Sequence, residues 1–166
     1  LGRATAEERA AKVEALLKDQ AALTTLRDLK SKLGSNLFRA VRAGLDGFDA
    51  KHPGASEAVK KSLEAFKTSV TAAREKYFRR LARWEFHKLA EKLAEAKLKQ
   101  KDVKLADMRS FLKRDLVNTA FEALAARMGK VDDVTVEEAR GFWEKRWEGV
   151  LKSGWIRRSY MGGTFI

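Results

Sequence analysis

The stretch from Ala55 to Met128 constrains the fold of this chain more than any other feature, because it contains neither glycine nor proline. These two residues are the strongest breakers of helices. Within the stretch, apolar residues recur at alternating spacings of four and three, a heptad-like pattern typical of a helix that packs against a neighbour. The first run of the pattern is Val59, Leu63, Phe66, Val70, Ala73 and Tyr77. We therefore predict a long central helix over residues 56–99, about 65 Å long at the rise of an α-helix.

The heptad-like pattern changes phase after Tyr77. Beyond this residue the apolar positions resume at Leu81, Phe86, Leu89, Leu93 and Ala96. Such a shift is a stutter, which locally changes how one helix winds around another. A weaker stretch follows at residues 97–104, where the apolar content collapses and Asp102 can cap a further helix. The central helix is therefore predicted to end near residue 99.

Capping patterns and breakers place the other helices. Thr5 with Glu8, and Thr135 with Glu138, follow the Thr-x-x-Glu capping box that opens a helix. The only proline, Pro53, stands beside a glycine and marks the clearest break in the chain. The predicted helices cover residues 6–32, 36–48, 56–99, 104–128 and 136–152, and an extended tail covers 153–166. No segment alternates with a period of two, so we predict an all-α fold: a single domain over residues 1–166, an irregular antiparallel bundle of about five helices with a long central helix.

The formal net charge of +12 predicts an acidic partner. The excess is concentrated, because residues 51–104 hold 15 basic and 7 acidic side chains. Charged residues interrupt every apolar run well before the roughly 18 positions that a membrane-spanning helix needs. We therefore expect nucleic acid, an anionic membrane surface or an acidic protein as the partner, and no segment that spans a bilayer.

The stretch YFRRLARWEFHK, residues 77–88, lies within this basic region. On a helix, four basic side chains and a histidine share one face at spacings of three and four. They are Lys76, Arg79, Arg80, Arg83 and His87. Arginine guanidinium groups match phosphate oxygens with paired hydrogen bonds, so this face is a candidate site for phosphate or for an acidic partner. The alternative is a solvated helix face on which Glu75 and Glu85 form ion pairs of small energy.

The C-terminal part combines large aromatic side chains with arginine, a composition that interface hot spots favour. The residues concerned are Trp143, Trp147, Trp155, Arg157, Arg158, Tyr160 and Phe165. We predict that they dock on another protein. Two alternatives stay open: the segment folds back onto the chain's own bundle, or it contacts a lipid surface, which Trp and Arg also suit.

Components for catalysis and metal binding are scarce. The chain has no cysteine and two histidines, which leaves few parts for a nucleophile with its general base. His87 and Glu91 stand four residues apart, but no third ligand joins them at a recognisable spacing. We expect no enzymatic activity, no metal site, no cofactor and no small-molecule substrate.

These patterns favour a non-catalytic structural or accessory subunit of a large multiprotein assembly, with other protein subunits as partners. We expect a mitochondrial, membrane-associated complex such as an ATP synthase or a respiratory complex, because the chain is basic and starts at Leu1, as it would after removal of a transit peptide. Trimming from a longer protein or removal of an initiator methionine would give the same start. The first alternative is an RNA-binding accessory ribosomal protein that uses Arg79, Arg80 and Arg83 with the lysines of residues 97–104. The second is a peripheral protein that binds anionic lipid headgroups.

Overall fold

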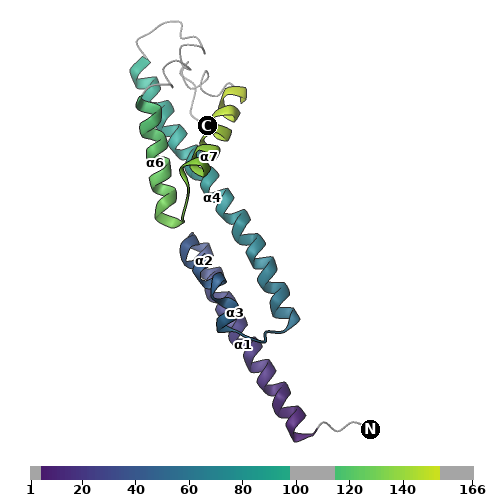
Figure 1. Cartoon of the computed structure of the whole chain (residues 1–166). Coiled ribbons are helices and arrows are strands. Elements are labelled where there is room, and N and C mark those ends of the chain that lie inside the picture. Colours follow the sequence, from purple (N-terminus) through teal and green to yellow (C-terminus); the bar gives the residue numbers. More distant parts are fainter. Residues whose placement is uncertain (1–4, 98–114, 154–166) are drawn as a thin grey trace. The chain divides into compact units, whose positions relative to one another are not determined.

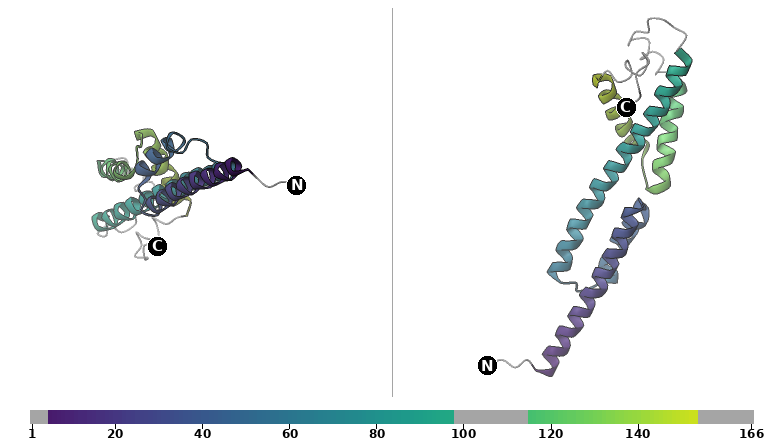
Figure 2. Two further views of the ribbon diagram at one scale, coloured as in Figure 1. Left: turned by 90° about the horizontal axis from the view of Figure 1, so that it is seen from below. Right: turned by 180° about the vertical axis from the view of Figure 1, so that it is seen from behind.

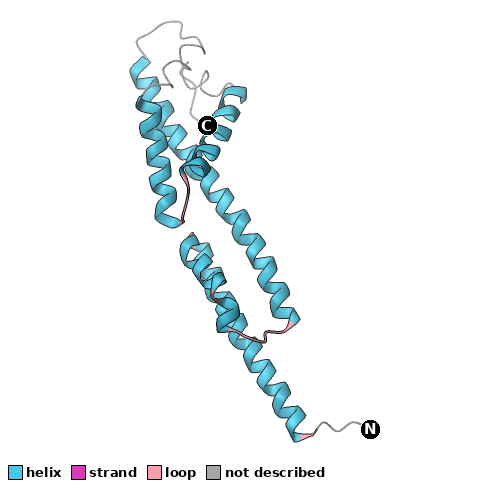
Figure 3. Ribbon diagram, viewed as in Figure 1, coloured by secondary structure: helices cyan, strands magenta, loops and turns pink. Residues whose placement is uncertain are grey.

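The computed structural model describes residues 5–97 and 115–153, and these residues form six helices (Figure 1). Their bounds are α1 Ala6–Gly34, α2 Phe38–Asp46, α3 Phe48–Lys51, α4 Glu57–Lys97, α6 Asp115–Val131 and α7 Val136–Ser153. The described residues contain no strand (Figure 3). The predicted all-α class and the long central helix, α4, are confirmed.

Local hydrogen bonds start and end helix α1. The predicted capping box is present: Thr5 Oγ1 accepts a hydrogen bond from the Glu8 amide at 3.1 Å, and the Thr5 amide donates to Glu8 Oε2 at 3.0 Å. The helix extends past its predicted end because the chain reverses only at Asn36, which has a left-handed φ of 58°. Asparagine tolerates this conformation better than most residues. The Leu37 amide closes the turn on the Lys32 carbonyl at 3.1 Å.

The predicted second helix is divided into α2 and α3 at Gly47. The Gly47 amide donates to the Ala43 carbonyl at 3.2 Å, and the Gly47 carbonyl starts the next turn by accepting from the Lys51 amide at 3.1 Å. Helix α2 also approaches α1 closely, since a Cβ atom added at Gly44 would clash with the buried Leu29 side chain. Glycine at this position therefore serves close helix packing, despite its low helix propensity.

The chain divides into two compact units, unit 1 (Leu1–Glu75) and unit 2 (Lys76–Ile166). The single domain over residues 1–166 stays a prediction. Helix α4 contributes residues to both units. Their boundary lies next to Tyr77, after which the apolar pattern changes phase. The stutter therefore marks the place in α4 where one set of core residues ends and the other begins.

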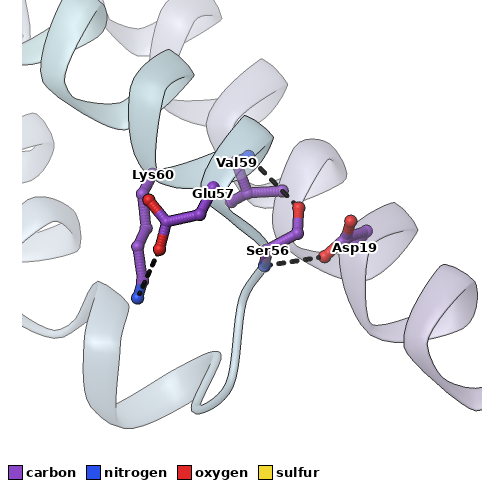
Figure 4. A network of polar contacts seen from close by, with 5 residues as sticks. All are labelled: Asp19, Ser56, Glu57, Val59 and Lys60. Carbon is purple, nitrogen blue, oxygen red and sulfur yellow. Dashed lines mark hydrogen bonds and ion pairs between the residues drawn. The ribbon is translucent and has the colours of Figure 1, made fainter.

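Unit 1 packs α1, α2, α3 and the first part of α4 around one core, with α2 and α3 running opposite to α1 and α4 (Figure 2). Its buried side chains are Ala22, Leu26, Leu29, Val41, Phe48, Val59, Leu63 and Phe66. A polar contact fixes the start of α4 against α1: the Ser56 amide donates to Asp19 Oδ1 at 3.2 Å, and Ser56 Oγ accepts from the Val59 amide at 3.4 Å (Figure 4). The loop residue His52 is likewise tied to α1, because its Nε2 lies 2.7 Å from Thr25 Oγ1.

Unit 2 packs the second part of α4 with α6 and α7, and α6 runs opposite to the other two (Figures 1 and 2). Its buried core residues are Phe78, Leu81, Ala82, Phe86, Leu89, Leu124, Met128, Ala139 and Trp143. The predicted helix 104–128 is described only from Asp115 onward, and it continues to Val131. The core of this unit positions the candidate site.

Candidate anion-binding pocket

A pocket of about 570 Å³ lies in unit 2, between α4 and α7. We call it the basic pocket. Its lining residues are Lys76, Arg79, Arg80, Ala82 and Arg83 of α4, and Phe142, Lys145 and Arg146 of α7. Six of these eight residues are cationic and none is acidic. The spacing of three and four places them along one side of each helix, so two helices direct positive charge into the same space.

Aromatic packing holds α7 in the position that this arrangement requires. Trp143 is 7 % exposed, and its ring stacks on Phe86 with the centroids 4.3 Å apart. Phe142 meets the buried Phe78 edge-on at 5.6 Å between centroids and forms an apolar wall of the basic pocket. Because these contacts fix α7 against α4, the two cations of α7 are held beside those of α4.

The guanidinium group of Arg146 lies in an unfavourable environment. Partial burial, and after it the positive charge of Arg83, lower the pKa of Arg146 from its usual value, although an arginine stays protonated at neutral pH. The Nε atom of Arg146 is buried and has no hydrogen-bond partner among the residues that the structure describes. A buried donor without a partner costs stability, and the repulsion from Arg83 acts in the same direction.

His87 lies next to the basic pocket without lining it. Partial burial lowers the pKa of His87, the charges of Arg83 and Arg146 lower it further, and Glu91 opposes them. Since the shift is downward from 6.5, the imidazole is predominantly neutral at neutral pH. The residue therefore adds little charge at neutral pH, but its protonation responds to the charge in the pocket.

The structure brings together four of the five residues that the sequence assigned to a basic face. Lys76, Arg79, Arg80 and Arg83 line the same pocket, and their role in binding phosphate stays a prediction. The sequence analysis did not include Lys145 and Arg146. The sequence does contain a sign of their position, because Lys145 and Arg146 lie between Trp143 and Trp147. Two tryptophans four residues apart lie on one side of a helix, so if they face the core, the residues between them point to other sides.

Two of the aromatic residues assigned to partner docking pack within unit 2. Trp143 belongs to the core, and Trp147 packs against it with its ring centroid 5.7 Å from that of Phe86. For these two residues the packing matches the alternative in which the segment folds back onto the chain's own bundle. The other members of the set lie outside the described residues, so their docking stays a prediction: Trp155, Arg157, Arg158, Tyr160 and Phe165. Of the lysine-rich stretch 97–104, only Lys97 is described.

Residues 5–97 and 115–153 contain neither a cluster of metal ligands nor a helix that could span a membrane. No group of three or more His, Asp or Glu side chains in these ranges is placed to hold a metal ion. None of their helices combines the length and the apolar character needed to cross a membrane. Comparison of the chain with known protein families, curated proteins and solved structures finds no match. A proposal about function therefore depends on the geometry of the basic pocket.

Proposed function

We propose that this protein is a non-catalytic accessory subunit of a ribonucleoprotein assembly, such as a ribosome, and that unit 2 binds RNA phosphates in the basic pocket. The observation that carries the proposal is the convergence of six cationic side chains from two helices on one pocket whose lining contains no carboxylate. Positive charges that converge on one pocket favour an anionic ligand. The planar guanidinium groups of arginine can also donate paired hydrogen bonds to phosphate oxygens.

Arg146 supports phosphate as the ligand group. Its buried Nε has no hydrogen-bond partner in the described part of the chain, and Arg83 repels its charge. A phosphate group supplies both an acceptor for the donor and negative charge for the pair of cations. The net charge of +12 also favours a ligand rich in phosphate, because long-range attraction speeds the encounter of a basic protein with a polyanion.

The apolar surface of unit 2 argues for RNA over an anionic membrane. A peripheral membrane protein inserts apolar side chains beside its basic face. Among the side chains of unit 2 whose burial the structure describes, the large hydrophobic ones that are exposed are Trp84 and Val136. Two separate residues on different helices do not make the apolar face that insertion into a headgroup layer requires.

Helix α1 supports a second candidate function, a structural subunit held by protein contacts in a large complex, such as a mitochondrial ATP synthase or respiratory complex. Its first half carries exposed apolar side chains: Val13 is 56 % exposed, Leu16 69 % and Leu17 60 %. Apolar residues at helical spacing suit the groove of a partner protein. This candidate predicts a large particle that ribonuclease leaves intact, whereas the ribonucleoprotein proposal predicts one that ribonuclease disperses.

Direct RNA binding tests the proposal. Wild-type affinity for RNA should fall steeply with rising salt, because each phosphate contact releases counterions. The double variant Arg83→Glu/Lys145→Glu reverses one exposed cation on each helix of the pocket. We expect it to weaken binding more than tenfold and to flatten the salt dependence by roughly one unit of slope for each lost contact.

A matched control separates the pocket from the overall charge. The variant Lys12→Glu/Lys30→Glu changes the net charge equally at two exposed positions of α1. It should retain most of the RNA affinity at physiological salt, where distant charges are screened. Equal losses in the two variants would reduce the effect to net charge, and a wild-type protein without affinity for RNA would overturn the proposal.

A further inference from the structure

Trp84 is an exposed aromatic residue in a strongly charged part of unit 2. Its side chain is 54 % exposed, although tryptophan is one of the residues that gain most from burial. Two neighbouring cations lie over its ring: the guanidinium carbon of Arg127, on α6, is 5.2 Å from a Trp84 ring centroid, and Lys88 Nζ is 5.9 Å from a Trp84 ring centroid. The Arg127 side chain is itself fixed, because its Nη1 donates to the buried Glu85 Oε1 at 3.0 Å.

The position of Trp84 on α4 relates it to the basic pocket. Arg80 lines the pocket and stands one helical turn before Trp84, and Lys88 stands one turn after it. Residues four apart lie on the same side of a helix, about 6 Å from one another. A ligand that follows α4 from the basic pocket therefore reaches the indole ring after one turn.

We infer that the RNA bound by unit 2 is single-stranded, and that Trp84 stacks on an unpaired base whose neighbouring phosphates lie in the basic pocket. This inference rests on the proposed function. Proteins that bind single strands combine a positively charged groove with exposed aromatic rings, on which bases stack. Bases in a duplex are already stacked on one another, so an indole on the protein surface reaches only unpaired bases.

The surroundings of Trp84 favour a base over an apolar protein surface. A tryptophan that anchors a protein interface usually lies at the centre of a dry apolar patch. Here the side chains one turn away on α4 are Arg80 and Lys88, and Arg127 approaches from α6. Among the side chains of unit 2 whose burial the structure describes, the other exposed large hydrophobic residue is Val136, on α7. An unpaired base can stack on the exposed part of the Trp84 ring, while the phosphates on either side of the base pair with the cations that lie over the ring.

The test compares oligouridine with an RNA duplex of the same length in equilibrium binding to the full chain. We expect Trp84→Ala to weaken binding of oligouridine roughly tenfold or more and to leave binding of the duplex within a factor of two. Trp84→Phe keeps an aromatic ring and should restore most of the affinity. The control Val136→Ala removes an exposed apolar side chain from the same unit and should bind oligouridine like the wild type.

The outcomes separate this inference from the proposed function. Loss of oligouridine binding in Arg83→Glu/Lys145→Glu together with wild-type binding in Trp84→Ala would overturn the stacking role and leave RNA binding by the pocket in place. Equal weakening for single strands and duplex in Trp84→Ala would also overturn it, because that pattern indicates a structural role for the ring. If neither RNA binds to the wild type, the proposed function fails and the inference fails with it.

Discussion

Two arginines of unit 2 lie in opposite electrostatic environments. Arg127 pairs with Glu85, a carboxylate that is 4 % exposed, at 3.0 Å. Arg146 is partly buried near Arg83, and its Nε has no hydrogen-bond partner among the described residues. The first arginine neutralises a buried charge, whereas the second adds to a cluster of like charge. The proposed anionic ligand would account for an arginine at position 146, which the contacts within the described part of the chain do not stabilise.

Replacing each arginine by methionine should change stability in opposite directions. Arg146→Met removes a repelled charge and keeps an apolar stem, so we expect the free energy of unfolding to rise by about 0.5 kcal/mol, the lower end for improved surface charge. Arg127→Met removes the shorter of two ion pairs of Glu85 and leaves the pair with Lys88, at 3.6 Å. It should lower the free energy of unfolding by about 1–3 kcal/mol. Urea denaturation measures both, and destabilisation by Arg146→Met would contradict a binding role for this side chain.

The pKa of His87 should report the occupancy of the basic pocket. Burial and the charges of Arg83 and Arg146 lower this pKa below 6.5 in the free protein. A bound phosphate offsets those charges, so the pKa of His87 should rise on binding. By linkage, the protein then takes up a proton with the ligand, and affinity should increase as the pH falls through the pKa that His87 has in the complex.

Proton NMR titration of the imidazole, with and without oligouridine, measures this shift. The variant His87→Gln should lose the part of the pH dependence that follows the protonation of His87 and keep its affinity at pH 8, where the wild-type imidazole is neutral in both states. His52 is an internal control, because it belongs to unit 1 and contacts Thr25. A His87 pKa that is the same with and without oligouridine would place the bound RNA away from the pocket.

At the scale of elements, the sequence predicted those features of the helices that are determined by residues close together in the chain. The capping box at Thr5 and the long α4 follow from short patterns and were found where they were predicted. The division at Gly47 was not predicted, because the apolar spacing continues through it to Phe48. The contribution of Lys145 and Arg146 to the pocket was also not predictable, since it depends on how α7 packs on α4. Periodicity gives the faces of a helix but not which partner covers each face.

The aromatic stack between α4 and α7 should control the shape of the basic pocket. Phe86→Leu keeps an apolar side chain but removes the stacking on Trp143 and Trp147, each contact contributing about 0.5–1.5 kcal/mol beyond burial. We expect a loss of about 1–3 kcal/mol in the free energy of unfolding. RNA affinity should also fall in conditions where the variant is fully folded, because α7 then holds its two cations less firmly.

Phe48→Leu is the matched control for this prediction. Phe48 is 1 % exposed and belongs to the core of unit 1. The substitution should destabilise the protein to a similar extent without weakening RNA binding to the folded state. Circular dichroism during thermal unfolding gives the stability, and fluorescence anisotropy of a labelled oligouridine gives the affinity. Equal losses of affinity in the two variants would mean that general destabilisation, and not the position of α7, controls binding.

At the scale of the whole molecule, the two units divide the surface features between them. Unit 2 holds the basic pocket and the exposed Trp84, and unit 1 holds the exposed apolar side chains of α1. Each unit has its own buried core. Compact units with separate cores can open separately, so a ligand that binds one of them stabilises mainly that one.

Hydrogen exchange should therefore show where RNA binds. At an oligouridine concentration of a hundred times the dissociation constant, binding stabilises the unit that holds the ligand by about 2.7 kcal/mol. This corresponds to exchange about a hundredfold slower for amides that exchange by opening of that unit. We expect the slowing in α6, α7 and the part of α4 that follows Glu75, and no change in α2 and α3. Slowing confined to α1 would move the binding site to its exposed apolar side chains, and equal slowing in both units would show that they open together.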